Sequence, residues 1–252
     1  MPMPHASVII PAAGAGRRFG AAGPGGGRAD GAAQGKVFAP LAGRPVLAHV
    51  LDRFASVRAV AEVVVAVPGD RVDWAAEAFG DALADGRRLA FVAGGGDRAA
   101  SVALALAATD RGNELVAIHD AVRPLIRPEV IEEAFRVAIE CGAAVVGRPV
   151  DHTIKRVGAD RRVAATVARD ALWMAQTPQV FRREIITQAY GRRDDVIGPV
   201  TDDAQLVEAM GQAVAMVPGD AANIKITTPQ ELRVCEALLA AGWPFEPDRA
   251  RP

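Results

Sequence analysis

A buried strand that opens directly into a loop of small residues constrains the fold of this chain more than any other stretch. Val8, Ile9 and Ile10 are β-branched without polar alternation, as in a strand covered on both faces of a sheet. The run stops at Pro11 and continues as Ala-Ala-Gly-Ala-Gly-Arg-Arg18. Small residues let a polyanion reach backbone N–H groups, and the arginines add positive charge. This order predicts a phosphate-binding loop at the carboxyl end of a central strand.

Strand-like and helix-like segments alternate along most of the chain. Apolar runs predict strands at 8–10, 62–67, 89–92, 115–118 and 143–146, and apolar residues at helical spacing predict helices at 45–57, 72–79 and 129–141. Such alternation is typical of an α/β fold with a Rossmann-like, doubly wound, mostly parallel sheet, which binds ligands beyond the carboxyl ends of its strands. We expect a single domain over residues 5–242 and a loose, Pro-rich tail at 243–252.

The segment from about residue 150 to 175 departs from this alternation. Two short alternating runs, 153–157 and 162–167, flank a turn at 158–160, which predicts a β-hairpin arm projecting from the main sheet. Exposed hairpin edges invite pairing with another chain, so a homodimer through the arm is expected. Beyond the arm, the pattern predicts helices at 183–190 and 202–210, the second capped by Thr201, and a strand at 213–217. A last helix begins with the capping box Thr228-Pro-Gln-Glu231.

The composition excludes several function classes. Lys and Arg total 29 against 30 Asp and Glu, a net charge of -1, so we expect no nucleic-acid partner and any anion site must be local. Cys141 and Cys235 form no CxxC motif or Cys/His cluster, which argues against a disulfide scaffold or structural zinc. The amino terminus, Met-Pro-Met-Pro-His, has neither a basic region nor a long apolar run. We therefore expect no signal peptide, no membrane span and a cytoplasmic location.

Polar or Gly-rich segments follow the first, third and fourth predicted strands and are expected to converge in one cleft. The third strand precedes Gly94-Gly-Gly-Asp-Arg-Ala-Ala-Ser101, whose glycines let a planar base approach the backbone. The fourth strand precedes His119-Asp-Ala-Val-Arg-Pro124. Asp120 at a strand end is a candidate ligand for Mg²⁺ or a ribose hydroxyl, with a turn or cap aspartate as the alternative; His119 is interpreted as structural.

Arg18 and Lys36 bracket a Gly/Ala-rich segment, 20–35, that could close over a triphosphate. Such cations stabilise charge on the oxygens of a reacting phosphorus, although solvated surface charge is the commoner role of Lys and Arg. Gly14, Gly16 and Gly20 also form GxGxxxG, close to the fingerprint of nicotinamide-dependent oxidoreductases. That fingerprint requires a helix that begins directly at the glycines and an acidic residue at a strand end. The sequence provides neither, so the oxidoreductase class is disfavoured.

Together these motifs resemble those of one family, the 2-C-methyl-D-erythritol 4-phosphate cytidylyltransferases of the non-mevalonate isoprenoid pathway. The matching pieces run in family order from about residue 7 to 240. They are Pro11-Ala-Ala-Gly-Ala-Gly-Arg-Arg18, Lys36, Gly94-Gly-x-x-Arg98-x-x-Ser-Val102, His119-Asp-Ala-x-Arg-Pro124, Thr153-Ile-Lys155, Arg169-x-x-Leu-Trp173, Gln176-Thr-Pro-Gln179, Thr201-Asp-Asp203 and Asn223-Ile-Lys-Ile-Thr227. Each piece alone is unspecific, whereas the ordered set is specific.

The resemblance implies transfer of CMP from CTP to methylerythritol 4-phosphate, a sugar-alcohol phosphate, with release of pyrophosphate and with Mg²⁺ as cofactor. It assigns Arg18 and Lys36 to the transition state at the α-phosphate, and Arg169 and Lys225 to the attacking phosphate. The implied nucleotide-binding residues are Ala12, Ala13, Gly14, Gly16, Gly95, Gly96, Arg98, Ser101 and Asp120, with Asp120 also at the metal, and the implied acceptor-binding residues are Thr153, Thr177 and Arg123. In the family, arm residues reach into the partner's site.

Four departures and two alternatives accompany this resemblance. Ala222 stands where a carboxylate can occur, and Gly96 stands where an aspartate is often found near the base. Where the family usually has Asp before the arm threonine, this chain has His152, with Asp151 one place earlier, and the loop before Lys36 is longer than usual. The alternative acceptor is ribitol 5-phosphate or another sugar phosphate, since such cytidylyltransferases share the CTP-binding half. The alternative class without catalysis is a nucleotide-binding regulator, which would bind CTP and release no pyrophosphate.

Overall fold

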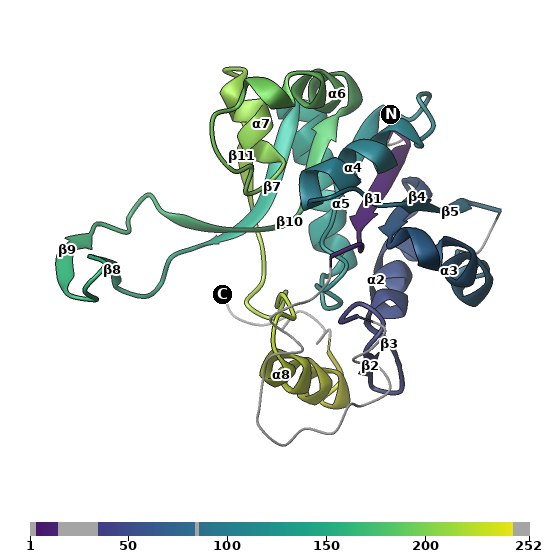
Figure 1. Cartoon of the computed structure of the whole chain (residues 1–252), viewed down its shortest axis with the longest axis horizontal. Helices are drawn as coiled ribbons and strands as arrows, with labels where there is room; N and C mark the ends of the chain where they lie inside the picture. The colour runs from purple at the N-terminus through teal and green to yellow at the C-terminus, as the bar shows by residue number, and fades with distance from the viewer. Residues whose placement is uncertain (1–3, 15–34, 84–85, 244–252) are drawn as a thin grey trace, which may run out of the picture.

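The structure is a computed structural model, and it describes residues 4–14, 35–83 and 86–243. Within these residues a seven-stranded sheet has the order β11-β7-β10-β6-β1-β4-β5 (Figure 1). Its strands are β1 (Ala6–Pro11), β4 (Val60–Val67), β5 (Arg88–Ala93), β6 (Leu115–Ile118), β7 (Ala143–Pro149), β10 (Trp173–Arg182) and β11 (Ala215–Pro218). β1 pairs in parallel with β4 and β6, and β4 pairs in parallel with β5. The predicted Rossmann-like α/β class is confirmed.

Strand β10 lies in the middle of the sheet, antiparallel to both β6 and β7. No strand is predicted for this segment from the sequence, and Pro178 within it cannot donate a hydrogen bond to a sheet ladder. The structure accommodates Pro178 where the pairing with β7 shifts between Ala175 and Gln179. Direct pairing resumes at Gln179, whose partner on β7 is Val145. The sheet is therefore mixed, with β10 as its antiparallel member.

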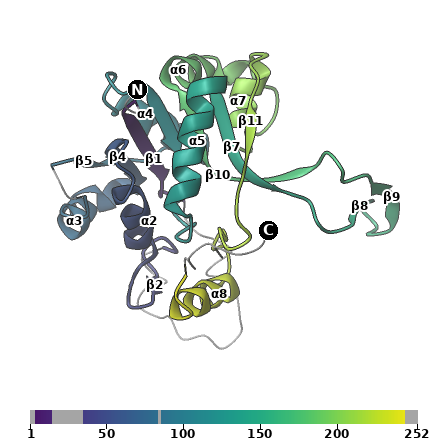
Figure 2. The ribbon, with the colours of Figure 1, turned by 180° about the vertical axis from the view of Figure 1, so that it is seen from behind.

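Helices cover both faces of the sheet (Figures 1 and 2). One core contains residues of α2 (Val46–Ala55), α3 (Val72–Phe79) and α5 (Pro128–Cys141), and the other contains residues of α4 (Arg98–Ala107), α6 (Arg183–Gly191) and α7 (Ala204–Ala209). Along β1, Val8 and Ile10 point into the first core and Ile9 into the second. Because both faces are covered, β1 is apolar at successive positions, as its sequence indicates.

The remaining short elements are β2 (Pro40–Leu41), β3 (Arg44–Pro45), η2 (Gly69–Arg71) and η3 (Arg193–Asp195), and the last helix is α8 (Pro229–Ala240). The predicted capping box of α8 is confirmed, since Thr228 and Glu231 cap each other's backbone N–H. The predicted cap of α7 by Thr201 is wrong. Asp203 occupies the N-cap position, and the hydroxyl of Thr201 donates instead to Gln205 Oε1 at 3.0 Å. None of the helices in the described residues is long and apolar enough to cross a membrane.

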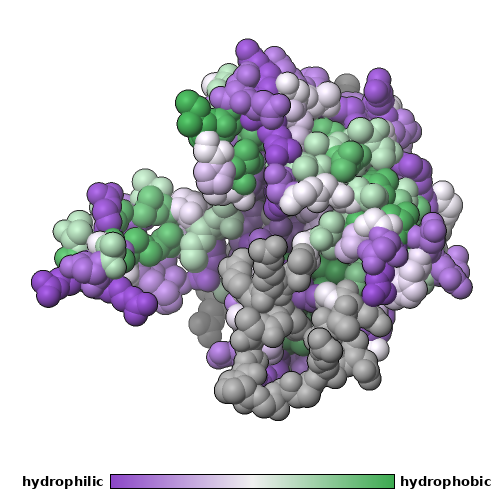
Figure 3. Space-filling model, viewed as in Figure 1, coloured by the Kyte–Doolittle hydropathy of each residue, from purple (hydrophilic) through white to green (hydrophobic). Residues whose placement is uncertain are grey.

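The arm extends away from the sheet where β7 ends and β10 begins (Figures 1 and 2). Its tip is a two-stranded antiparallel sheet of β8 (Ile154–Val157) and β9 (Val163–Val167), which confirms the predicted hairpin. Apolar residues lie exposed among the hydrophilic ones on this arm (Figure 3), with Val157 54% and Val163 61% accessible. The predicted tail beyond Trp243, and residues 20–34 of the predicted Gly-rich loop, lie outside the described residues.

Candidate active site

A cavity of about 310 Å³ opens at the carboxyl ends of β1, β5 and β6. The loops that follow these three strands line it, as the sequence analysis predicts from the topology of parallel sheets. It brings together the predicted residues Ala12, Ala13, Gly14, Lys36, Gly95, Gly96, Arg98, Ser101, Asp120 and Lys225. Gly16 and Arg18 lie outside the described residues.

The loop before α4 forms a tight glycine turn against β1. A Cβ on Gly94 would lie 2.3 Å from the Cβ of Ala13, and a Cβ on Gly95 would lie 2.5 Å from that of Ala100. The loop is also fixed by hydrogen bonds, because Ser101 Oγ accepts from Gly95 N at 3.0 Å and donates to the backbone oxygen of Asp97 at 2.8 Å. Glycine is therefore required for this close approach, and the loop is ordered before any ligand arrives.

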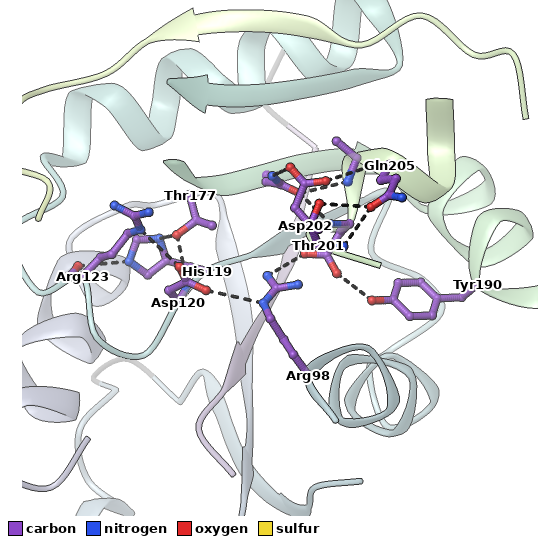
Figure 4. Close-up of polar contacts among 12 residues, drawn as sticks. Arg98, His119, Asp120, Arg123, Thr177, Tyr190, Thr201, Asp202 and Gln205 are labelled. Carbon is purple, nitrogen blue, oxygen red and sulfur yellow. Dashed lines mark hydrogen bonds and ion pairs between the residues drawn. The ribbon is translucent and has the colours of Figure 1, made fainter. Parts of the chain in front are cut away.

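Asp120 is surrounded by cations. Its Oδ2 lies 2.9 Å from Lys225 Nζ and 3.2 Å from Arg123 Nε. Its Oδ1 lies 3.5 Å from Arg98 Nε (Figure 4). Although burial opposes ionisation, the charges of Lys225, Arg98 and Arg123 hold the pKa of Asp120 well below its ordinary value. Because the cations around this carboxylate outnumber it, the cavity is suited to a polyanion.

Asp120 also fits a magnesium ion that arrives with phosphate ligands. Among the described residues there is no group of three or more His, Cys, Asp or Glu side chains that could hold a metal by themselves. Mg²⁺ in phosphoryl-transfer sites is commonly held by one or two carboxylates, with substrate phosphates and water completing its shell. Since Oδ1 of Asp120 has only the long contact to Arg98 among the described residues, it is the oxygen best placed for this role.

Three buried side chains hold Asp120 in place. Thr177 Oγ1 accepts a hydrogen bond from the backbone N–H of Asp120 at 3.0 Å, and it lies 3.1 Å from His119 Nδ1 (Figure 4). Arg123 donates through Nη1 to the backbone oxygen of Asn223 at 2.8 Å, which ties the turn after β6 to the segment that carries Lys225. Neither Arg123 nor Thr177 lines the cavity itself.

His119 is neutral and has a defined tautomer. Its Nε2 lies 3.1 Å from the backbone oxygen of Arg123, which can only accept, so Nε2 carries the hydrogen and Nδ1 accepts from the Thr177 hydroxyl. Burial lowers the pKa of His119 to about 4. The imidazole therefore stays uncharged near neutral pH and supports the turn, in agreement with the structural role expected for it.

The free energy of unfolding is expected to fall as the pH drops from 6.5 to about 4. In this window the unfolded histidine, with its ordinary pKa of 6.5, binds a proton that the folded His119 does not. Integrating this difference gives a loss of about 3 kcal/mol, measurable by urea unfolding at several pH values. His119→Gln should flatten this slope, whereas His152→Gln, at a side chain 92% exposed, should preserve it. An unchanged slope in His119→Gln would contradict the assignment.

Comparisons with known proteins agree with this geometry. The sequence model of one family, IspD or 2-C-methyl-D-erythritol 4-phosphate cytidylyltransferase, matches residues 6–241. A member from Solibacter usitatus is 41% identical over 239 residues, covering 92% of this chain and 95% of the relative. This chain belongs to the IspD family.

Solved IspD structures share the fold. The 2-C-methyl-D-erythritol 4-phosphate cytidylyltransferase from Thermus thermophilus is 34% identical, with a TM-score of 0.71, covering 94% of this chain and 99% of the other. A 4-diphosphocytidyl-2C-methyl-D-erythritol synthase from Anaerococcus prevotii is 29% identical, with a TM-score of 0.78 and the same two coverages. The resemblance deduced from the motifs is confirmed.

Two residues that the IspD resemblance assigns to the acceptor lie on the exposed arm and not in the cavity of the described chain. Thr153 is exposed just before β8, and Arg169 is exposed after β9, where its Nη1 donates to the backbone oxygen of Asp151. Asp151 also pairs with Arg148. Within one chain, these residues are separated from the loops that line the cavity.

No sequence pattern marks Asp203 or Tyr190 as functional by itself, although Asp203 belongs to an IspD motif. In the structure Arg98 Nη2 donates to Asp203 Oδ2 at 2.7 Å, and Tyr190 donates to Asp203 Oδ1 at 2.6 Å (Figure 4). Arg98 and Asp203 are 105 positions apart in the sequence. No local pattern could have linked them, because the contact joins the start of α4 to the residue before α7, which only the tertiary fold brings together.

Proposed function

We propose that this chain transfers CMP from CTP to 2-C-methyl-D-erythritol 4-phosphate, giving 4-diphosphocytidyl-2-C-methyl-D-erythritol and pyrophosphate. The observation that carries this proposal is the cavity in which a glycine turn faces Lys36, Arg98 and Lys225 around Asp120. The glycine turn suits the cytidine, because backbone N–H groups and a flat surface can meet the base there. The cations suit the triphosphate and the attacking phosphate.

The mechanism needs no general base. The nucleophile is a phosphate monoester, which is already anionic near neutral pH, and it attacks the α-phosphorus of CTP in line with the departing pyrophosphate. The P–O bond to the β-phosphate breaks and its electron pair leaves with pyrophosphate. Lys36, together with Arg18, would stabilise the charge on the α-phosphate oxygens, and Lys225 would orient the attacking phosphate. The neutral, buried His119 is consistent with this scheme.

Asp120 would hold Mg²⁺ through Oδ1 together with oxygens of the triphosphate. A bound Mg²⁺ would neutralise phosphate charge and favour one orientation of the triphosphate. The chain's own contribution is to present one ionised carboxylate beside a cationic surface, at the end of β6.

We also propose that the enzyme is a homodimer in which the arm of one protomer completes the acceptor site of its partner. The support is that Thr153 and Arg169 on the arm do not line the cavity of their own chain, and that the apolar residues Val157, Val163 and Trp173 on the arm are exposed. Exposed strand edges and apolar side chains of this kind are typical of surfaces covered by another chain. Thr153 and Arg169 would then reach the acceptor in the partner's cavity.

One assay tests the function. Pyrophosphate release is measured from CTP and Mg²⁺ with methylerythritol 4-phosphate or with ribitol 5-phosphate as acceptor. We expect release with the first acceptor and little with the second. Release with ribitol 5-phosphate alone would shift the function to that acceptor. Tight binding of CTP without release with either acceptor would favour a regulator, and NADP binding without any effect of CTP would favour an oxidoreductase.

Arg169→Ala is expected to raise the KM for the acceptor and to spare CTP. A charged hydrogen bond to phosphate is worth about 1.5–3 kcal/mol, so the KM should rise roughly 10- to 100-fold. The measurement is the pair of KM values from steady-state pyrophosphate release. Arg162→Ala is the matched control, because Arg162 is an arm arginine whose side chain is 89% exposed. A rise in the KM for CTP with an unchanged acceptor KM would remove Arg169 from the acceptor site.

A further inference from the structure

Arg98 is shared between two carboxylates, and the two contacts are unequal. Its Nη2 lies 2.7 Å from Asp203 Oδ2, a direct charged hydrogen bond, whereas its Nε lies 3.5 Å from Asp120 Oδ1, beyond ordinary hydrogen-bond length. The side chain of Arg98 is 28% exposed and lines the candidate nucleotide cavity. Its position in that cavity therefore depends mainly on Asp203.

Asp203 is itself rigidly held. Its side chain is fully buried, and its second oxygen, Oδ1, accepts from the Tyr190 hydroxyl at 2.6 Å (Figure 4). Its backbone N–H donates to Gln179 Oε1 at 2.9 Å, and the next backbone N–H, that of Ala204, donates to the same oxygen at 3.0 Å. Gln179 of β10 thus fixes the backbone of Asp203 at the start of α7, and Tyr190 of α6 fixes its carboxylate.

We propose that Asp203 is a positioning residue for the nucleotide: it draws Arg98 away from Asp120, so that the guanidinium faces the triphosphate and Asp120 Oδ1 stays open. This inference rests on the proposed function. Asp203 does not line the cavity and acts through Arg98. Tyr190 supports the same arrangement by fixing the orientation of the Asp203 carboxylate.

Charge explains why a neutral hydrogen-bond partner would not suffice. Asp120 is already approached by Lys225 and Arg123, and without the negative charge of Asp203 the nearest carboxylate for Arg98 would be Asp120. Pairing of Arg98 with Asp120 Oδ1 would turn the guanidinium inward and block the oxygen best placed for a cation. The carboxylate of Asp203 is therefore needed as a competing partner.

The test uses Asp203→Asn, which keeps the shape and the hydrogen-bonding capacity of the side chain. An asparagine can still accept from Arg98 through Oδ1 and donate to the Tyr190 oxygen through Nδ2, so the fold should be retained. CTP binding by the full chain is measured by calorimetry with no acceptor present. We expect the Kd for CTP to rise about 10-fold, the loss of one charge-assisted contact, with an unchanged KM for the acceptor. Tyr190→Phe should also raise the Kd for CTP, by a smaller factor. It replaces Asp203→Asn as the test variant if Asp203→Asn does not fold.

A double-mutant cycle separates positioning from general structural support. In an Arg98→Ala background, Asp203→Asn should cause no further loss of CTP affinity, because its effect passes through Arg98. Asp195→Asn is the control for the loss of one carboxylate: Asp195 is an exposed side chain that pairs with Arg192 and does not line the cavity, and this variant should keep the CTP Kd within about twofold. An equal loss of affinity in both backgrounds, or an unchanged Kd in Asp203→Asn, would overturn the proposal. If the wild-type chain fails to bind CTP, the proposed function fails instead.

Discussion

Asp120→Asn is expected to lower kcat by about 10³-fold while leaving CTP binding in the absence of Mg²⁺ unchanged or tighter. The variant removes the carboxylate proposed to hold the metal, so the charge that builds up at the α-phosphate loses about 4 kcal/mol of stabilisation. At the same time Lys225, Arg98 and Arg123 lose their shared counter-charge, which makes the cavity more positive. The variant should therefore lose turnover without losing affinity for CTP in the absence of Mg²⁺.

The measurement combines pyrophosphate release at saturating substrates with calorimetry of CTP in the presence of a chelator. Asp52→Asn is a suitable control, because Asp52 is an exposed carboxylate that pairs with Arg44 far from the cavity. Its kinetic constants should match those of the unmodified chain. If Asp120→Asn keeps its turnover, Asp120 is not the metal ligand. If the variant loses only CTP affinity in the absence of Mg²⁺, Asp120 is a nucleotide-binding group.

Lys36→Ala is expected to lower kcat by about 10²- to 10³-fold with a CTP Kd within about threefold of the unmodified chain. Lys36 lines the cavity, and the backbone beside it is held by Leu47 N, which donates to Val37 O at 2.9 Å. Phe38 packs edge-on against Trp74, with ring centroids 5.0 Å apart, which fixes the segment further. A cation held in this way can act on the reacting phosphorus without reorganising. Arg18→Ala should behave in the same way by the family resemblance.

Single-turnover kinetics measure the rate of CMP transfer by Lys36→Ala, and calorimetry measures its Kd for CTP. Arg58→Ala, at an exposed arginine far from the cavity loops, controls for the loss of a surface cation. The role assigned to Lys36 is wrong if CTP affinity collapses while turnover at saturation survives. That outcome would place Lys36 among the groups that bind the ground state.

Much of the fold could be predicted from local patterns. The strand predicted at 115–118 matches β6 residue for residue, and those predicted at 62–67 and 89–92 lie inside β4 and β5. Strands buried on both faces have continuous apolar runs, which are local signals and need no knowledge of the partner strands. The capping box of α8 is local in the same sense, since its two residues are three positions apart.

Strand β10 and the role of Thr201 could not be predicted from local sequence patterns. Pro178 is a strong local signal against a strand, yet strand pairing on both sides outweighs it. Thr201 is a good local cap, but tertiary contacts start α7 two residues later than expected, at Ala204. In both places the local preference is small beside the free energy of burying the surrounding segment.

The candidate site likewise combines features that the sequence predicts with contacts that depend on the tertiary structure. The sequence by itself determined the chemistry available: a glycine turn, an aspartate at a strand end, a set of cations and the order of motifs shared with the IspD family. Only the tertiary structure decided which of these groups meet. It brings Lys225 and Arg98 into contact with Asp120, and Asp203 into contact with Arg98. It also places Thr153 and Arg169 on the arm and away from the cavity. The physical reason is that hydrogen bonds and ion pairs depend on distances of a few ångströms between residues far apart in the chain, and packing sets those distances.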